Sequence, residues 1–321
     1  MHKQIFNPVR RELEMVEGNL NQNIDSGVDV LNQASMHLAK AGGKRLRPAF
    51  ALLAARFFLD NLEQVIPMAT ALELTHLATL VHDDVIDNSV LRRGTYTVKQ
   101  QWGNRVSINA GNYIFARALA LSASYQRRDI LEVLAQASMK ICEGEIYQMM
   151  SSYNVDVGLK NYLRRIERKT ALLISVSCKL GAMIAGAQAA QIRALEMYGY
   201  YLGMAFQVTD DILDFVADEE LLGKPTGSDI KQGVITLPAI YALHHSPDKE
   251  ELRYLLSSPS LCSTQSERIL DIVLSSDGVD YAYWVTEHFA GKARKELDRL
   301  PDQPVKSTLY EIADFISARE Y

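Results

Sequence analysis

The stretch ILEVLAQASMKICEGEI, from Ile130 to Ile146, decides the fold class of this chain. Its apolar side chains recur at the spacing of one helix face. The stretch lies within Met68–Lys224, a segment without proline, and proline interrupts helix interiors and central strands alike. Alternating strands joined by Asn-Gly or Asp-Gly turns are scarce. We therefore expect an all-α protein built from long helices.

Length and composition limit the architecture. The chain has 321 residues, of which 48% are hydrophobic and 23% charged, an ordinary globular mixture. Neither a repeat of fixed period nor a linker-like shift in composition divides the sequence. We expect a single large helical domain over residues 1–321.

Charge and cysteine usage restrict location and partners. The net charge of −5 gives no support for nucleic-acid binding, and we expect none. The three cysteines are an odd number without metal-type pairing, which fits a reducing compartment. The first residues lack the apolar core of a signal peptide, and no run approaches about 18 uncharged apolar residues. We expect a cytoplasmic protein with at most peripheral membrane contact.

Two acidic clusters carry the candidate chemistry. The first reads HDDVID from His82 to Asp87, and the second reads TDDILD from Thr209 to Asp214. Each contains Asp-Asp-x-x-Asp, and the first and last aspartates of such a motif share one face of a helix. The pairs that share a face are Asp83 with Asp87 and Asp210 with Asp214.

One such cluster is most often a solvated acidic helix surface. Two copies with equal spacing, each beside apolar sequence, favour a ligand, because crowded carboxylates repel one another and resist desolvation. A hard divalent cation relieves both costs. Mg²⁺ takes a few carboxylates together with water and substrate phosphate oxygens. The clusters therefore predict Mg²⁺ bridging a diphosphate between two facing helices.

Basic residues accompany both clusters along the sequence. Taken singly, each is more often a solvated charge than a ligand. Guanidinium forks and lysine charges are nevertheless the groups that phosphate oxygens require. With the acidic clusters they predict two phosphate sites, one bridged by metal and one held directly by lysine and arginine. The basic candidates are Lys44, Arg47, Arg92, Arg93, Lys169 and Lys224.

Helical phase adds two residues to the acidic stripes. His76 lies seven residues before Asp83, nearly on the same stripe, although a lone histidine there is more often structural. Gln207 precedes Asp210 by three residues and Asp214 by seven, so the three share a face.

The order of these motifs resembles that of the trans-isoprenyl diphosphate synthases. The resemblance runs from about Gln33 to Ala242, and the C-terminal part is more loosely similar. Within the family, the tract from Tyr162 to Cys178 is most similar to the catalytic component of bacterial heptaprenyl diphosphate synthases. The tracts that carry the resemblance are GGKRLRP from Gly42, HDDVID from His82, LRRG from Leu91, RKTA from Arg168, FQVTDDILD from Phe206 and GKPTGSD from Gly223.

The resemblance implies an isoprenoid-synthase fold, one large helical bundle around a central active-site cavity. It implies a long-chain trans-polyprenyl diphosphate synthase that joins isopentenyl diphosphate to an allylic prenyl diphosphate. The implied cofactor is Mg²⁺, about three ions, with Asp83, Asp87 and Asp210 as ligands and Asp214 acting through water. Asp84 and Asp211 would be secondary.

The resemblance also assigns the two substrate sites. It places Lys44, Arg47, His76 and Arg93 at the diphosphate of isopentenyl diphosphate. For the allylic diphosphate it implies Arg92, Lys169, Thr170, Gln207 and Lys224. Of these, Lys169, Thr170 and Gln207 are the implied catalytic residues, with Thr170 and Gln207 placing dipoles near the allylic cation.

One position departs from the family pattern. Where the family carries Gly-Lys-x-Thr-Leu-Pro, this chain has GVITLP, from Gly233 to Pro238. Val234 has no phosphate-binding side chain, and whether Lys231 substitutes for the missing lysine stays open.

Two other functions stay open at this point. A terpene cyclase also ionises a diphosphate with an Asp-rich Mg²⁺ cluster, but it needs no second diphosphate site, so the Lys44–Arg47 turn speaks against it. A non-catalytic regulatory subunit is expected to lose acidic motifs, and both are intact here.

Small residues predict a long product. Thr79 lies one helical turn before Asp83, and Ala78 is its neighbour. Short-chain members of the family carry bulky aromatics at these places. We expect a product of about six to ten isoprene units, with seven as first choice by resemblance, for quinone side chains such as menaquinone. Small residues are also common where helices merely pack closely.

The resemblance leaves two assemblies open. The chain acts either with a small, separately encoded subunit or as a homodimer, and the sequence shows no obvious docking motif.

Overall fold

The structure is a computed structural model that describes residues 5–216 and 226–318. The described chain is almost entirely helical, which confirms the all-α prediction. It divides into two compact units. The helices α7 (Arg128–Met150), α9 (Leu172–Ile184), α10 (Ala189–Val216) and α18 (Pro304–Ser317) each contribute residues to both units. The single domain expected from the sequence stays a prediction.

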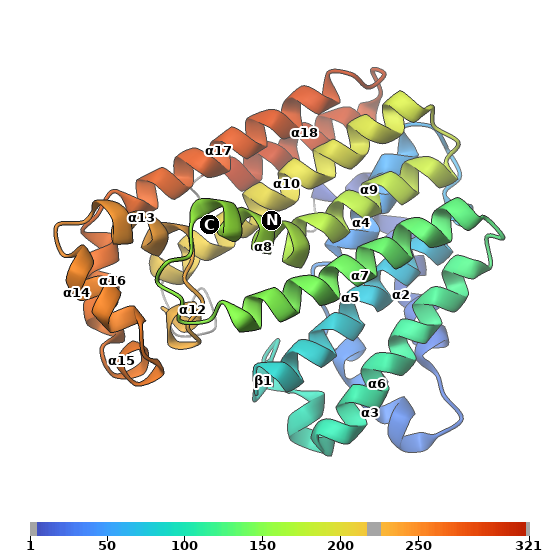
Figure 1. The fold of residues 1–321 in the computed structure, drawn as a ribbon. Helices are drawn as coiled ribbons and strands as arrows, with labels where there is room; N and C mark the ends of the chain where they lie inside the picture. The colour runs from blue at the N-terminus through green and yellow to red at the C-terminus, as the bar shows by residue number, and fades with distance from the viewer. Residues whose placement is uncertain (1–4, 217–225, 319–321) are drawn as a thin grey trace. The chain divides into compact units, whose positions relative to one another are not determined.

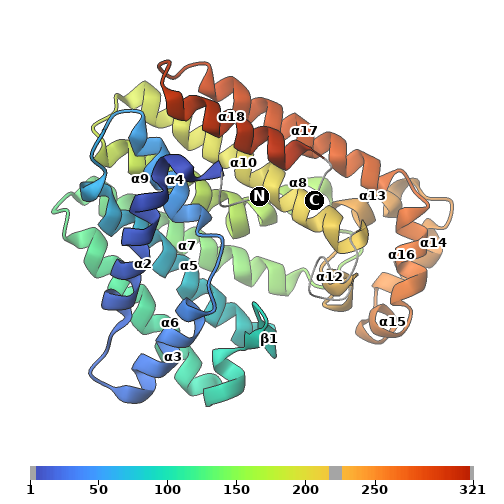
Figure 2. The same cartoon turned by 180° about the vertical axis from the view of Figure 1, so that it is seen from behind.

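Unit 1 contains the N-terminal helices. Its central helix is α5, which packs against α2, α4 and α6 (Figures 1 and 2). The helices that lie wholly in unit 1 are α2 (Arg10–Ile24), α3 (Asp29–Lys40), α4 (Leu46–Arg56), α5 (Ile66–Ile86) and α6 (Val98–Ala123), with short 3₁₀ turns at Asn7–Val9 and Glu63–Val65.

Helix α5 is apolar on nearly every side. Its buried residues include Leu72, Leu74 and Leu77, which lie on different faces, as expected of a helix in the centre of a core. The segment Glu63–Ile86 is the one described helix long and apolar enough, by length and composition, to span a membrane. Because 72% of its most apolar window is buried, packing inside the unit accounts for its composition.

A small hairpin follows α5. Strand β1 (Leu91–Arg92) pairs antiparallel with β2 (Thr95–Tyr96). The two residues between them, Arg93 and Gly94, have φ of 52° and 76°, as a tight hairpin turn requires. The sequence predicts few hairpins, because it contains few Asn-Gly and Asp-Gly turns between alternating runs. Here arginine occupies the left-handed position.

Unit 2 contains a second core. Side chains from α10, α13, α16 and α17 meet in it, among them Ile212, Leu243 and Val285. The elements that lie wholly in unit 2 are α8 (Leu159–Ile166), a π-helical turn (Glu167–Ala171), α12 (Ser228–Lys231), α13 (Leu237–His245), α14 (Lys249–Leu256), α15 (Pro259–Thr264), α16 (Ser266–Leu274) and α17 (Gly278–Leu297).

Candidate active site

The first acidic motif occupies the C-terminal end of α5. Asp83 is half-buried and Asp87 exposed. The buried Asp84 instead accepts two hydrogen bonds from Arg92, at 2.9 Å from Nε and 2.6 Å from Nη2. Burial raises the pKa of Asp84, and the Arg92 guanidinium opposes that rise. The middle aspartate therefore ties α5 to the hairpin, while the outer two retain exposure.

Four arginines lie close enough to His76 on α5 to act on its charge: Arg45, Arg47, Arg92 and Arg93. Burial, followed by the charges of Arg47 and Arg93, lowers the pKa of His76 well below its usual value. The imidazole is therefore neutral at pH 7, and it can donate a single ring N–H.

The arginines differ in how their charge is balanced. Arg45 donates to Glu17, with one bond of 3.1 Å from Nη2, and to Oε1 of Glu73 at 2.9 Å from Nη1. By contrast, Nε of Arg47 and Nη1 of Arg93 are shielded from solvent and have no hydrogen-bond partner among the described residues. Burial lowers the pKa of Arg47 to about 10. Unsatisfied buried guanidinium nitrogens are costly, so this cationic cluster of Arg45, Arg47, His76, Arg92 and Arg93 suits an anion.

The turn before α4 lies against the Arg93 guanidinium, which the hairpin supplies. A Cβ built on Gly43 would lie 2.8 Å from Nη1 of Arg93, closer than real Cβ atoms approach. The missing side chain at Gly43 therefore leaves room for the Arg93 guanidinium, which a larger residue would displace. Lys44, the next residue, is exposed.

The second acidic motif lies near the end of α10 in unit 2. Asp210 is exposed, whereas Asp211 is buried and accepts hydrogen bonds from the Tyr162 hydroxyl at 2.7 Å and from Nε2 of Gln207 at 2.8 Å. The Thr170 hydroxyl donates to Oε1 of Gln207. Burial and the nearby Asp229 carboxylate raise the pKa of Asp211 to about 7. A continuous network thus orients the Gln207 amide.

A π-helical turn presents Lys169 and Thr170. The turn spans Glu167–Ala171, between α8 and α9, where we expected an uninterrupted helix. Such turns are rare and concentrate at functional sites. Nζ of Lys169 lies 3.4 Å from Oε1 of Gln148 on α7. Helix α10 approaches this turn closely at Gly203. A Cβ built on Gly203 would lie only 2.5 Å from Cα of Ala171.

Asp214 anchors the segment around α12. It is fully buried, its Oδ1 accepts from the Ser228 hydroxyl at 2.7 Å, and its Oδ2 accepts from the backbone N–H of Asp229 at 3.0 Å. The role through water predicted for Asp214 stays a prediction, and the structure adds this anchoring contact.

The acidic residues fit Mg²⁺ by their donor chemistry. Within residues 5–216 and 226–318, no group of three or more acidic, histidine or cysteine side chains could hold a metal ion by itself. Mg²⁺ commonly takes only one or two carboxylates and completes its shell with water and phosphate oxygens. The carboxylates of Asp83, Asp87 and Asp210 supply the hard oxygen donors that this ion prefers.

The structure groups most predicted residues within one unit or the other. Lys224 lies outside the described residues. Lys231 is exposed, and whether it substitutes for the lysine that the family carries at position 234 stays open. The roles of all these residues remain predictions. Unit 1 holds Lys44, Arg47, His76, Ala78, Thr79, Asp83, Asp87, Arg92 and Arg93, and unit 2 holds Lys169, Thr170, Gln207, Asp210 and Asp214.

Sequence reasoning missed several residues that support the site. Glu73 balances Arg45, and its position in an apolar helix three residues before His76 was an available signal. Tyr162 lies seven residues before Lys169, so helical phase could also have found it. Nothing in the sequence pattern indicated Gln148.

Comparisons with known proteins agree with the resemblance. A family model described as Polyprenyl synthetase matches residues 28–273. Heptaprenyl diphosphate synthase component 2 of Geobacillus stearothermophilus is 42% identical over 319 residues, covering 99% of each chain. The crystal structure of heptaprenyl diphosphate synthase from Staphylococcus aureus has a TM-score of 0.91 at 37% identity, covering 97% of this chain and 98% of that one. The polyprenyl synthase from Caulobacter crescentus CB15, complexed with calcium and isoprenyl diphosphate, has a TM-score of 0.91 at 33% identity. This match covers 99% of this chain and 98% of that one.

Proposed function

We infer that this chain, which belongs to the polyprenyl synthetase family, is a long-chain trans-polyprenyl diphosphate synthase. It is a prenyltransferase that adds isopentenyl diphosphate units to an allylic diphosphate. The observation that carries this function is that α5 bears groups of opposite charge. His76 belongs to the cationic cluster, and Asp83, two turns or roughly 10 Å further along the axis, begins the acidic motif. A terpene cyclase has one diphosphate to bind and no use for the cationic cluster.

The acidic residues serve the leaving group. Mg²⁺ held by Asp83, Asp87 and Asp210, with Asp214 acting through water, would neutralise the charge that grows on the departing diphosphate. Arg92, Lys169 and Lys224 bind the allylic diphosphate itself. The polyprenyl synthase of Caulobacter crescentus crystallised with calcium and isoprenyl diphosphate supports a divalent cation in this family.

The network around Gln207 serves the allylic cation. The Gln207 amide is held by Asp211 and Thr170, so its dipole needs no reorganisation as positive charge develops. Thr170 contributes a second dipole from the π-helical turn.

The cationic cluster positions the second substrate. Lys44, Arg47, His76 and Arg93 hold the diphosphate of isopentenyl diphosphate, so that its double bond attacks the allylic cation. The condensed cation then loses a proton. His76 is a weak base because its pKa is lowered by burial and by the guanidiniums beside it. We therefore propose that the departed diphosphate takes this proton.

The product we propose contains about seven isoprene units and supplies quinone side chains such as menaquinone. Full-length likeness to heptaprenyl diphosphate synthases supports this length. Because that Geobacillus relative is called component 2, we propose that this chain also acts with a small separate subunit. We place the enzyme in the cytoplasm, with peripheral membrane contact for product release.

Incorporation of labelled isopentenyl diphosphate into an allylic primer tests the reaction. Purified wild-type protein with Mg²⁺ should make extended prenyl diphosphates, and both Asp83→Asn and Asp210→Asn should slow turnover by about a hundredfold or more. Asp302→Asn, at an exposed aspartate, is the matched control and should retain wild-type turnover. Circular dichroism should show equal helix content in all four proteins. Near-normal turnover in both variants would contradict the proposal that Asp83 and Asp210 bind Mg²⁺.

Chain-length analysis with and without the small component of a relative tests the partner. Long products at full rate from this chain alone would contradict the two-component proposal.

A further inference from the structure

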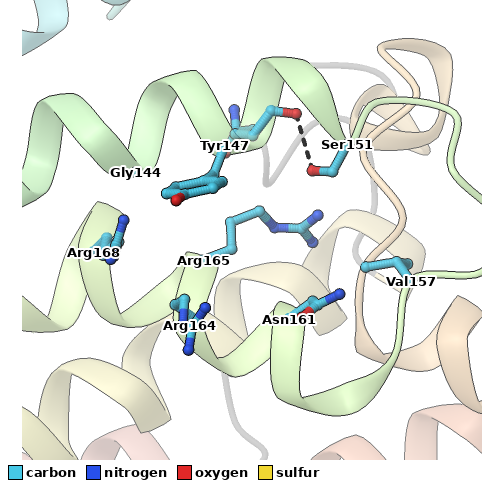
Figure 3. Close-up of a pocket in the computed structure, with 9 residues that line it drawn as sticks. Gly144, Tyr147, Ser151, Val157, Asn161, Arg164, Arg165 and Arg168 are labelled. Carbon is cyan, nitrogen blue, oxygen red and sulfur yellow. Dashed lines mark hydrogen bonds between the residues drawn. The ribbon is translucent and has the colours of Figure 1, made fainter.

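A cavity of about 240 Å³ lies between α7 and α8, entirely within unit 2. We call it the α7–α8 pocket. Helix α7 contributes Tyr147 and Gln148, and α8 with the following turn contributes Arg164, Arg165 and Arg168. Figure 3 shows Tyr147 on the α7 side, across from the three arginines. The pocket is thus a cavity walled on one side by guanidiniums.

The lining of this pocket is strongly cationic. Three of its nine lining residues are arginines, and none is acidic. The chain as a whole carries a net charge of −5, so the pocket opposes the overall charge. Cavities lined by one sign of charge focus the field and concentrate ions of the opposite sign.

The arginines keep donors that the protein does not use. Nη2 of Arg165 donates to the carbonyl of Ile235 at 2.7 Å, and its other nitrogens make no hydrogen bond to a described residue. Arg164 is exposed and forms neither a hydrogen bond nor an ion pair within the described chain. Each guanidinium offers five N–H donors, so most remain available to a ligand.

Arg168 is held in place by two contacts. Its guanidinium lies 5.1 Å from the centre of the Tyr147 ring, and its Nη1 forms an ion pair of 3.3 Å with Oε2 of Glu143. That nitrogen is shielded from solvent and makes no hydrogen bond within the described residues. A guanidinium fixed in this way keeps further N–H donors that can bind an oxyanion.

The spacing of the arginines is unfavourable without a ligand. Arg164, Arg165 and Arg168 line the same pocket, so their like charges lie close together, and the Glu143 carboxylate at 3.3 Å balances Arg168 alone. An anion in the pocket would relieve this repulsion.

The size of the cavity limits the ligand. Pockets for drug-sized molecules hold roughly 300–1,000 Å³, so this one suits an anion of few heavy atoms rather than a whole prenyl diphosphate. We propose that the α7–α8 pocket binds a small polyvalent oxyanion of the phosphate or diphosphate class, in addition to the diphosphates that react. Its sources are the inorganic diphosphate that the reaction releases and free phosphate.

The pocket is linked to the catalytic lysine, and this link rests on the proposed function. Gln148 lines the pocket, and its Oε1 is the acceptor 3.4 Å from Nζ of Lys169. An anion that accepts a hydrogen bond from Nε2 of Gln148 would therefore turn the amide whose Oε1 contacts Lys169. Occupancy of the pocket changes the affinity for the allylic substrate without occupying its site.

Calorimetry with inorganic diphosphate and, separately, inorganic phosphate tests the pocket. The experiment uses the whole chain, with EDTA and constant ionic strength. The pocket variant is Arg164→Gln with Arg168→Gln. The control is Arg128→Gln with Arg193→Gln, two arginines whose side chains are 91% and 63% exposed. Wild type and control should bind one of the anions with the same Kd. In the pocket variant this Kd should rise roughly tenfold to a hundredfold.

The calorimetric outcomes separate the alternatives. If the pocket variant loses only diphosphate binding, the ligand is the diphosphate that the reaction releases. If it loses phosphate binding, the ligand is free phosphate. Either result supports the proposal. Superimposable isotherms for all three proteins overturn it. Binding of hexaglutamate at the pocket, with neither anion bound, also overturns it in favour of an acidic protein segment. Should the double variant fail to fold, the single variant Arg164→Gln, at an exposed position, replaces it.

Inhibition kinetics test the link to Lys169. Inorganic diphosphate should inhibit wild type and control with a mixed pattern against the allylic substrate, and should inhibit the pocket variant competitively. Identical patterns in all three would overturn the link. Calorimetry needs no turnover, so it can separate the two proposals. If the wild type is inactive but binds the anion, and the pocket variant does not bind it, only the proposed function is contradicted.

Discussion

The hydroxyl of Tyr162 donates a 2.7 Å hydrogen bond to Oδ2 of Asp211. The second aspartate of the second acidic motif is therefore hydrogen-bonded inside the protein. Its Oδ1 accepts a further hydrogen bond from Nε2 of Gln207. In unit 1 the middle aspartate of the first motif, Asp84, is likewise bound internally, by Arg92. The middle aspartate of each motif therefore orders a neighbouring group. We propose the outer residues for metal, and of these Asp214 is also bound internally, by the Ser228 hydroxyl and the backbone N–H of Asp229.

Tyr162→Phe tests whether this order matters for catalysis. The variant deprives the buried Asp211 of one donor and loosens the orientation of Gln207. We expect kcat to fall about tenfold with a smaller change in KM, and the free energy of unfolding to fall by about 1–3 kcal/mol. Steady-state kinetics and urea denaturation measure both. Tyr200→Phe, at a half-buried tyrosine also in unit 2, is the control. An equal loss of stability with unchanged kcat would make Tyr162 purely structural.

Gly43→Ala tests the contact with Arg93. The added methyl would stand 2.8 Å from Nη1 of Arg93 and displace the guanidinium. We expect KM for isopentenyl diphosphate to rise by about tenfold, the effect of weakening a charge-assisted contact, while KM for the allylic substrate changes little. Gly27→Ala is the control, because no atom lies within 4 Å of its added Cβ. A selective rise in the allylic KM would mean that the two substrate sites are exchanged.

His76 predicts a pH dependence of stability. Its folded-state pKa is lowered by burial and by Arg47 and Arg93, so below pH about 6.5 the unfolded chain binds a proton that the folded chain does not. The free energy of unfolding should therefore decrease as pH falls below about 6.5, by up to about 1.4 kcal/mol per pH unit from this residue. Denaturation curves of His76→Gln should lack this contribution, and those of His288→Gln, at an exposed histidine, should keep it. Equal slopes in wild type and His76→Gln would refute the assignment.

Ala78→Phe combined with Thr79→Tyr tests product length. Ala78 is buried, and Thr79, whose hydroxyl bonds the carbonyl of His76 at 2.8 Å, is half-buried one turn before Asp83. Larger side chains there should shorten the product to about two to four units if the growing chain passes them, at a cost of about 1–3 kcal/mol in stability. Thermal unfolding should be checked first, followed by chromatography of the products. Full-length product from a folded variant would show that these positions do not limit the chain.

The sequence predicted most of the fold because helical phase carries much of the information. The period of apolar residues, together with the proline-free segment from Met68 to Lys224, predicted long helices, and the structure has them. The hairpin at Leu91–Tyr96 was missed because its turn uses arginine where asparagine is usual. The π-helical turn was missed because one extra residue barely alters a pattern read over a few turns.

The candidate site was predictable only in part. Equal motif spacing identified the aspartates, since i and i+4 share a face. Spacing does not tell which carboxylate turns inward, and the partners that decide this, Arg92 and Tyr162, come from outside the motifs. The α7–α8 pocket was not foreseen because its arginines belonged to a tract that was noted only for its family likeness.

The π-helical turn at Glu167–Ala171 makes this part of the chain more sensitive to deletion than to substitution. A π turn holds one residue more than an α turn, and one residue corresponds to about 100° of rotation around the helix axis. Deleting a residue here would restore α-helical hydrogen bonding, yet it would rotate everything before the turn relative to α9. Arg164 and Arg165 would leave the α7–α8 pocket, and Tyr162 would lose its register with Asp211, although each side chain would still be present. An alignment that closes this one-residue difference would therefore pair residues that do not occupy the same place.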